Sequence, residues 1–250
     1  MSGHAVTPLR AATRGSNLAR TQVDIVARLI GQRVEPVIVS TVGDRRAHEP
    51  ISAIGGRGAF VGDVRDALAA GAADIAVHSA KDLPPRDDPR FTLYFPRRGD
   101  PRDVLVGSTL QQLRGGAVVA TGAPRRRAQI SALRPDIELA ELRGNIETRL
   151  RRGERYDAIV MAAIAIERLG LSVERPIHAL EPSSFVPAVG QGAIAVETRA
   201  DDHQTRSLVA HLDDPATRAA LTAERAFLAA LGGDCDLPAG AHATVDRSGA

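Results

Sequence analysis

The chain has very few of the residues that build several common kinds of binding site. It contains no Trp, two Tyr, five Phe and a single Cys, Cys235, among 250 residues. One cysteine excludes a disulfide within the chain and a metal site made of several thiolates. Aromatic residues are 3% of the chain, so the stacking surfaces that hold single-stranded nucleic acids are scarce.

A large charge excess and long apolar runs are absent as well. The 32 basic and 30 acidic side chains leave a formal charge of only +2, which argues against a nucleic-acid partner. No run approaches the roughly 18 apolar residues of a membrane span. The start, Met1–His4, lacks the basic-then-apolar pattern of a secretory signal. We therefore expect no membrane partner and a cytoplasmic location.

Lysine is almost absent, because Lys81 is the only one and arginine supplies every other basic side chain. A codon bias toward GC-rich triplets explains the excess of arginine. It leaves two interpretations of Lys81 open: a chance survivor, or a place where a compact, rotatable ammonium is needed.

Short apolar or β-branched runs alternate with helical patterns from end to end, which predicts an α/β fold with parallel strands. Ser16 is a predicted N-cap for a helix whose apolar face is Leu18, Ile25, Val26, Leu29 and Ile30. Strands are expected at 9–13, 37–40, 74–78, 104–106, 118–121, 137–142, 158–161 and 193–196. Further helices are expected over 61–70, from Pro124, near Ile146, after Ala162, and in an amphipathic segment with Leu221, Ala226, Phe227, Leu228 and Leu231.

Arginines gather where predicted strands end and helices begin. Arg14 follows the first strand, Arg125 and Arg126 follow residues 118–121, and Arg143 and Arg149 follow residues 137–142. Ligands of open α/β sheets bind at these ends, and the arginine fork grips carboxylates and phosphates. A single arginine there is more often simply solvated. Their recurrence predicts a ligand with several carboxylates or phosphates.

The best acid/base candidate is Asp82, which follows the strand at 74–78 directly beside Lys81. A carboxylate beside a cation at a cleft rim can donate a proton or stabilise a developing cation. The alternative is a turn-capping Asp paired with Lys81, and the local sequence alone favours it. His78 is more often a packed core residue than a catalyst.

The chain resembles the hydroxymethylbilane synthase, or porphobilinogen deaminase, family. The resemblance is carried by colinear motifs at Ala12–Ala19 with Gln22, Gly55–Val61, Ala76–Pro84, Pro101–Asp103, Arg125–Arg126, Leu142–Asn145, Thr148–Leu150, Arg168–Gly170, Pro187–Gly192, Ala223–Ala226 and Gly232–Pro238. So many blocks in the family's order are not a chance match.

The resemblance implies an enzyme that joins four porphobilinogen molecules head to tail, releases ammonia, and works as a monomer without a metal. Cys235 would carry a dipyrromethane cofactor through a thioether. Asp82 would be the catalytic carboxylate, assisted by Lys81, that helps ammonia to leave and stabilises the azafulvene cation. Cofactor-binding positions would be Arg125, Arg126, Lys81, Thr121 and Ser16, and substrate-binding positions Arg14, Ser16, Gln22, Arg143, Arg149 and Arg168.

The resemblance also implies two periplasmic-binding-protein-like lobes with a central cleft and a small α+β third domain that is shorter than usual in the family. We expect the first lobe to be 1–97 and 193–212, the second 98–192, and the third domain 213–250 with Cys235.

Where the family usually has Thr-Ser-Ser-Leu, this chain has Thr121-Gly122-Ala123-Pro124, and Ala163-Ile164-Ala165 replaces a small segment with Gly. A second function therefore stays open. It is a catalytically impaired paralogue that binds a polycarboxylate, such as a tetrapyrrole, in the same cleft.

Overall fold

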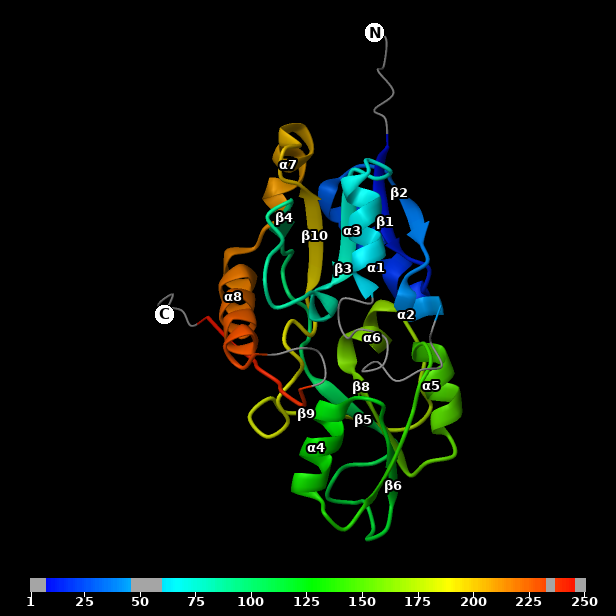
Figure 1. The fold of residues 1–250 in the computed structure, drawn as a ribbon. Helices are drawn as coiled ribbons and strands as arrows, with labels where there is room; N and C mark the ends of the chain where they lie inside the picture. The colour runs from blue at the N-terminus through cyan, green and yellow to red at the C-terminus, as the bar shows by residue number, and fades with distance from the viewer. Residues whose placement is uncertain (1–7, 46–59, 233–236, 246–250) are drawn as a thin grey trace.

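The computed structural model describes residues 8–45, 60–232 and 237–245. Residues 55–59 of the motif Gly55–Val61 and the cofactor position Cys235 lie outside these residues. The fold is α/β, as predicted, with two five-stranded sheets, one above the other in Figure 1. In the described residues, no helix is long and apolar enough to cross a membrane.

The first sheet has the strand order β2-β1-β3-β10-β4. Its parallel strands β1, β2 and β3 end at one edge, whereas β10 runs antiparallel between β3 and β4. The chain thus returns to this sheet after building the second one. The strands are β1 (Leu9–Arg14), β2 (Val34–Val39), β3 (Ile75–Ser79), β4 (Phe91–Tyr94) and β10 (Ile194–Arg199).

The second sheet repeats this arrangement in the order β7-β6-β8-β5-β9. Strands β6, β7 and β8 are parallel, and β5 runs antiparallel to β8 and β9. The strands are β5 (Asp103–Val106), β6 (Val118–Ala120), β7 (Glu138–Ala140), β8 (Ala158–Ala162) and β9 (Ile177–Leu180). We call the two sheets with their helices the first and second lobes.

Helices begin where the sequence offers caps. The Ser16 hydroxyl accepts from the Ala19 N–H and the Asn145 side chain accepts from the Thr148 N–H, while Pro124 opens its helix. The helices are α1 (Asn17–Ile30), α2 (Val42–Arg45), α3 (Gly62–Ala69), α4 (Pro124–Leu133), α5 (Ile146–Gly153), α6 (Ala163–Arg168), α7 (His203–Val209) and α8 (Pro215–Ala230), with 3-10 turns η3 (Ala80–Asp82) and η4 (Ala210–Leu212).

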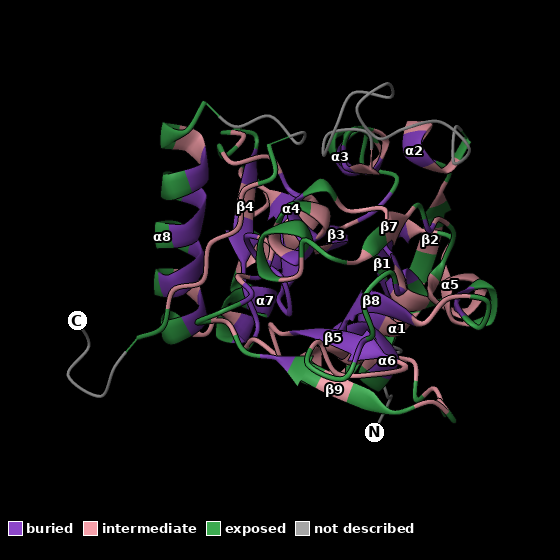
Figure 2. Cartoon of the chain, turned by 90° about the horizontal axis from the view of Figure 1, so that it is seen from below, coloured by how far each residue is buried: buried purple, intermediate pink, exposed green. Residues whose placement is uncertain are grey.

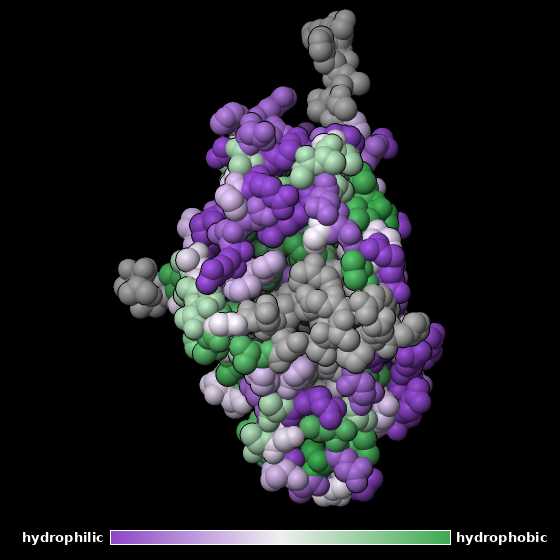
Figure 3. Space-filling view, viewed as in Figure 1, coloured by the Kyte–Doolittle hydropathy of each residue, from purple (hydrophilic) through white to green (hydrophobic). Residues whose placement is uncertain are grey.

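Two apolar faces differ from the prediction. Leu29 of α1 is 48% exposed, Phe227 of α8 is 47% exposed, and Leu231 directly after α8 is 49% exposed. Helix α8 instead buries a stripe through Leu221, Glu224 and Leu228, so one side of it is buried and the other exposed in Figure 2. Hydrophobic residues accordingly show on the surface over the lower end of α8 in Figure 3. The buried face of α8 thus includes the Glu224 carboxylate, which pairs with Arg98 at 2.6 Å.

The fold also contains β4, β9 and α7, which the sequence did not predict. Strand β4 is only four residues long, and β9 is an edge strand that leaves Ile177 exposed. Such short edge strands carry little periodicity of their own. The described part of 213–245 holds α8 and no strand. The expected limits of the three domains stay predictions.

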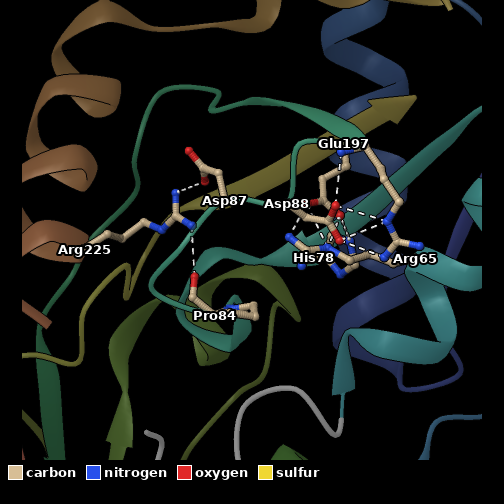
Figure 4. A network of polar contacts seen from close by, with 8 residues as sticks. Arg65, His78, Pro84, Asp87, Asp88, Glu197 and Arg225 are labelled. Atoms are coloured by element: carbon tan, nitrogen blue, oxygen red, sulfur yellow. Dashed lines mark hydrogen bonds and ion pairs between the residues drawn. The ribbon is translucent and has the colours of Figure 1, made fainter. Parts of the chain in front are cut away.

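A buried ion network fixes β10 within the first lobe (Figure 4). Glu197 on β10 is fully buried, and its carboxylate accepts from the Arg65 guanidinium on α3 at 2.6 Å and from His78 Nε2 on β3 at 3.2 Å. Burial alone would raise the pKa of Glu197. The hydrogen bonds from His78 and Arg65 outweigh it and lower the pKa to about 2. His78 is thus a packed core residue.

We expect Glu197→Gln to lower the free energy of unfolding by about 3–5 kcal/mol at neutral pH, because Arg65 keeps a buried charge without its partner. The depressed pKa of Glu197 means that this stability is present above pH 4.5 and disappears as the pH falls toward about 2. Urea unfolding of the parent and of Glu197→Gln between these pH values measures the difference in the free energy of unfolding. Glu35→Gln, in an exposed pair with Arg33, is the matched control, and an equal loss in both variants contradicts the prediction.

Candidate active site

A cleft of about 540 Å³ lies where the parallel strands of the two lobes end. The first lobe contributes Thr13, Arg14 and Ser79, which end β1 and β3, and the second contributes residues that follow β6 and β7. The carboxyl ends of parallel strands collect helix N-termini and their free N–H groups, so this edge favours anions. The volume suits a small-molecule ligand.

Five predicted arginines, Arg14, Arg125, Arg126, Arg143 and Arg149, all line this cleft. They come from both lobes, and the structure therefore brings together side chains that are up to 135 residues apart in the sequence. Each of these guanidiniums also makes contacts with other residues of the chain, and these contacts limit the directions that it can take.

Arg14 at the end of β1 forms an ion pair with Asp44 of α2 at 2.5 Å, and its guanidinium stacks over the Phe60 ring at 4.1 Å. The Thr41 hydroxyl donates to the same carboxylate at 2.7 Å. Burial opposes ionisation of Asp44, but the bonds from Arg14 and Thr41 hold its pKa below the usual value. Arg14 is thus oriented from two sides.

Arg125 and Arg126 open α4 and are almost fully buried. Their ion pairs to the carboxylate of Asp103 measure 2.6 Å and 2.7 Å. Desolvation would raise the pKa of Asp103, and the charges of Arg126 and Arg125 hold it low instead. The two guanidiniums are therefore fixed at the floor of the cleft.

Arg143 and Arg149 approach from the loop after β7 and from α5. Arg143 Nε donates to the Glu141 carboxylate at 2.8 Å, and Arg149 Nε donates to the Gly144 carbonyl at 2.7 Å. Burial and the like charges of Arg126 and Arg143 lower the pKa of Arg149 to about 10. Crowded cations of this kind favour an anionic ligand that relieves the repulsion.

Lys81 and Asp82 stand together on the η3 turn, and both line the cleft. In the described part of the chain, the Asp82 carboxylate makes no hydrogen bond or ion pair, so the turn-capping alternative has no bond to support it. Burial, followed by the charge of Arg126, lowers the pKa of Lys81 to about 8. The turn thus presents a carboxylate and a desolvated amine to the same space.

Gly190, in the segment between β9 and β10, packs closely against the backbone of the η3 turn. Gly190 has a φ of +73°, and a Cβ there would lie 2.9 Å from the Ala80 carbonyl carbon and 3.0 Å from the Lys81 nitrogen. Only glycine allows both the backbone conformation and the close approach.

Ser16 and Gln22 of the first lobe also line the cleft. The Gln22 amide donates to the Ser79 hydroxyl at 2.8 Å, and Ser79 is a cleft residue that the sequence reasoning did not single out. Gln191 is a second cleft residue of this kind, and Asp103, which does not line the cleft itself, pairs with two of the arginines that do. All three lie within motifs that carry the family resemblance, which is the signal that could have found them.

Two of the predicted site residues that the structure describes do not line the cleft. Thr121 is fully buried, and the Arg168 guanidinium donates to the Gly192 carbonyl at 2.7 Å between the lobes. Cys235 lies outside the described residues, but Leu237 and Ala239, close to it in the chain, do line the cleft. In the described residues, no group of three or more His, Cys, Asp or Glu could hold a metal ion.

Two matched lobes with arginines from both at one cleft define a two-lobed α/β protein with an arginine-lined cleft between the lobes. Residues 9–207 match the family model described as "Porphobilinogen deaminase, dipyromethane cofactor binding domain". The chain belongs to the porphobilinogen deaminase family, a family of transferases.

Curated relatives agree over almost the whole chain. Porphobilinogen deaminase from Roseiflexus castenholzii is 49% identical over 95% of this chain and 82% of its own length. That from Acidothermus cellulolyticus is 46% identical over 96% of this chain and 76% of its own length.

Solved structures with a similar arrangement are more distant. A nutrient binding protein from Burkholderia cenocepacia bound to methionine has a TM-score of 0.49 and 14% identity, with 83% of this chain and 92% of that chain covered. An ancestral cationic amino acid solute binding protein has the same TM-score and identity, with 82% and 87% covered.

The lowered pKa of Lys81 can be measured directly, since the chain has no other lysine. We expect the rate of acetylation of Lys81, followed by peptide mass spectrometry, to rise through an inflection near pH 8, because the neutral amine is the reactive form. Arg126→Gln removes a cation that lowers the pKa and should move the inflection upward. An inflection above pH 10 in the parent protein contradicts the assignment.

Proposed function

We propose that the chain is a hydroxymethylbilane synthase, which joins four porphobilinogen molecules head to tail, releases ammonia, and frees the linear tetrapyrrole hydroxymethylbilane by hydrolysis. The observation that carries the proposal is the arginine-lined cleft with Asp82 and Lys81 at its side, in a chain of the porphobilinogen deaminase family. Tetrapyrrole, and hence haem, biosynthesis is the process that this reaction serves.

Each porphobilinogen brings an acetate and a propionate, so a growing chain presents many carboxylates to one cleft. Arg14, Arg143 and Arg149 line the cleft and supply forks for these groups, with Ser16 and Gln22 as hydrogen-bonding partners. The substrate-binding role of Arg168 stays a prediction, because its guanidinium donates to the Gly192 carbonyl between the lobes and does not line the cleft. Arginine is favoured over lysine here because its fork is planar and binds a carboxylate with two parallel bonds.

Asp82 is proposed to manage the protons and the positive charge. Its carboxyl group can give the proton with which the amino group leaves as ammonia, and the resulting carboxylate then faces the cation left on the substrate methylene. After the new carbon–carbon bond forms, a pyrrole carbon loses a proton, which Asp82 can accept. Lys81 assists beside it, with a pKa of about 8 that lets either charge state exist near neutral pH.

The cleft fits the dipyrromethane cofactor that the matching family model names. Leu237 and Ala239 line the cleft, and the chain beside Cys235 therefore reaches it. Arg125, Arg126, Lys81 and Ser16 offer the cationic and hydroxyl groups that a polycarboxylate needs. The Thr121 hydroxyl accepts a hydrogen bond at 3.4 Å from the N–H of Ala123, which lines the cleft. When bound, the cofactor supplies a primer on which the product grows.

An impaired paralogue that only binds a polycarboxylate is the less favoured function, because the relatives at this level of identity are porphobilinogen deaminases. Gly122, which replaces a family serine, is required by the local packing: a Cβ there would lie 2.8 Å from the Leu142 carbonyl oxygen. We further propose that the enzyme acts as a cytoplasmic monomer, without nucleic-acid or membrane partners.

We expect Asp82→Asn to lower turnover of porphobilinogen by about 100-fold or more, the usual contribution of general acid–base catalysis. The amide keeps the shape of the side chain but cannot supply a proton in the same way. Steady-state assay of cofactor-loaded protein measures the effect. Asp88→Asn is the matched control, because Asp88 pairs with Arg90 outside the cleft. Turnover within a few-fold of the parent would refute the role of Asp82.

We expect active protein to carry one dipyrromethane on Cys235, seen as added mass and as colour with Ehrlich's aldehyde. Cys235→Ser should abolish the adduct, the colour and the turnover, because it removes the only thiol. Turnover by protein whose Cys235 is unmodified would overturn the mechanism. Unmodified protein without turnover would favour the binding-only paralogue.

A further inference from the structure

Asp103 has no role in the function proposed above, yet it is the carboxylate beneath the cleft. It opens β5, and its side chain is fully buried. Its two oxygens accept hydrogen bonds from three side chains, Arg125, Arg126 and Gln191. A carboxylate without exposed surface does not contact a ligand itself, so any effect on the reaction passes through these partners.

Helix α4 does not by itself bring the guanidiniums of Arg125 and Arg126 together. Consecutive residues of an α-helix point about 100° apart, and two like charges repel. Here Oδ2 of Asp103 accepts from Arg125 Nη2 at 2.6 Å, while Oδ1 accepts from Arg126 Nε at 3.1 Å and Nη2 at 2.7 Å. One carboxylate thus gathers both guanidiniums at the cleft floor.

Gln191 connects this cluster to the two segments that join the lobes. Its amide donates to Asp103 Oδ1 at 2.8 Å and to the Pro101 carbonyl at 2.7 Å. Pro101 lies between β4 and β5, where the chain leaves the first lobe, and Gln191 lies between β9 and β10, where it returns. The position of the arginine pair is therefore tied to both crossings.

Arg125 and Arg126 both line the cleft, whereas Asp103 does not. A guanidinium binds a ligand carboxylate with two parallel bonds only when its fork is held in the right direction. The hydrogen bonds to Asp103 therefore set how this part of the cleft meets a carboxylate.

We infer that Asp103, together with Gln191, is a positioning residue that fixes the Arg125–Arg126 pair for the carboxylates of the cofactor and the growing chain. This inference rests on the proposed function. It assigns a task to the Pro101–Asp103 and Pro187–Gly192 motifs, and it predicts that a change at Asp103 reproduces the defect of a change at the arginines themselves.

The test compares enzyme intermediates in the folded holoenzyme. Parent, Asp103→Asn, Arg125→Lys and Arg126→Lys proteins are mixed with limiting porphobilinogen, and native mass spectrometry gives the distribution of chain lengths on each. Asp100→Asn is the matched control, because Asp100 pairs with Arg102 at 2.8 Å and does not line the cleft.

We expect Asp103→Asn to accumulate the same intermediate as Arg125→Lys or Arg126→Lys, about ten-fold above the parent, as loss of a hydrogen bond to a charged group implies. Asp100→Asn should match the parent. A merely structural role would lower the yield of folded protein and leave the distribution on that protein unchanged, and this result would overturn the inference.

Gln191→Met keeps the test decisive if Asp103→Asn does not fold, because it removes one neutral donor and leaves both ion pairs. It should accumulate the same intermediate to a smaller extent. A parent-like distribution on either folded variant overturns the inference. Absence of any intermediate on the parent protein would instead overturn the proposed function, and with it this inference, so the two failures are distinguishable.

Discussion

A buried charge is tolerated only beside its opposite, and three buried carboxylates meet this constraint by joining distant parts of the chain. Glu197 ties β10 to α3 and β3. Glu224 of α8 accepts from Arg98 at 2.6 Å and from the Gly190 N–H at 2.8 Å. Asp103 gathers Arg125, Arg126 and Gln191. The lobes, α8 and the cleft floor depend on these contacts.

The same constraint gives the cleft its chemistry. Arg65 pairs with a carboxylate away from the cleft and stabilises the fold, whereas the five cleft arginines present their guanidiniums to one space. Burial, together with the charge of Arg126, lowers the pKa of Lys81 and Arg149. Asp82 stands among these cations without a bond from the described residues, which leaves its carboxylate available to a substrate.

The structure accounts for two of the departures from the family pattern, Gly122 and Ile164. Gly122 is enforced by the carbonyl of Leu142, and the side chain of Ile164, which the sequence places in a segment that has Gly in the family, packs toward Gly99, where a Cβ would lie only 2.5 Å away. Glycine at position 99 leaves room for the Ile164 side chain, and glycine at position 122 leaves room for the Leu142 carbonyl. The two departures do not remove any of the five arginines from the cleft.

The sequence by itself determined the α/β class, most strands, the helix starts at Ser16 and Pro124, and the arginines at strand ends, because these depend on local periodicity and residue type. It did not determine the short strands β4 and β9 or the buried face of α8, since these follow from what packs against them. Only the tertiary structure decided that adjacent Arg125 and Arg126 meet at one point. The carboxylate that draws them together, Asp103, lies 22 and 23 residues away along the chain, and sequence pattern carries no record of such a contact.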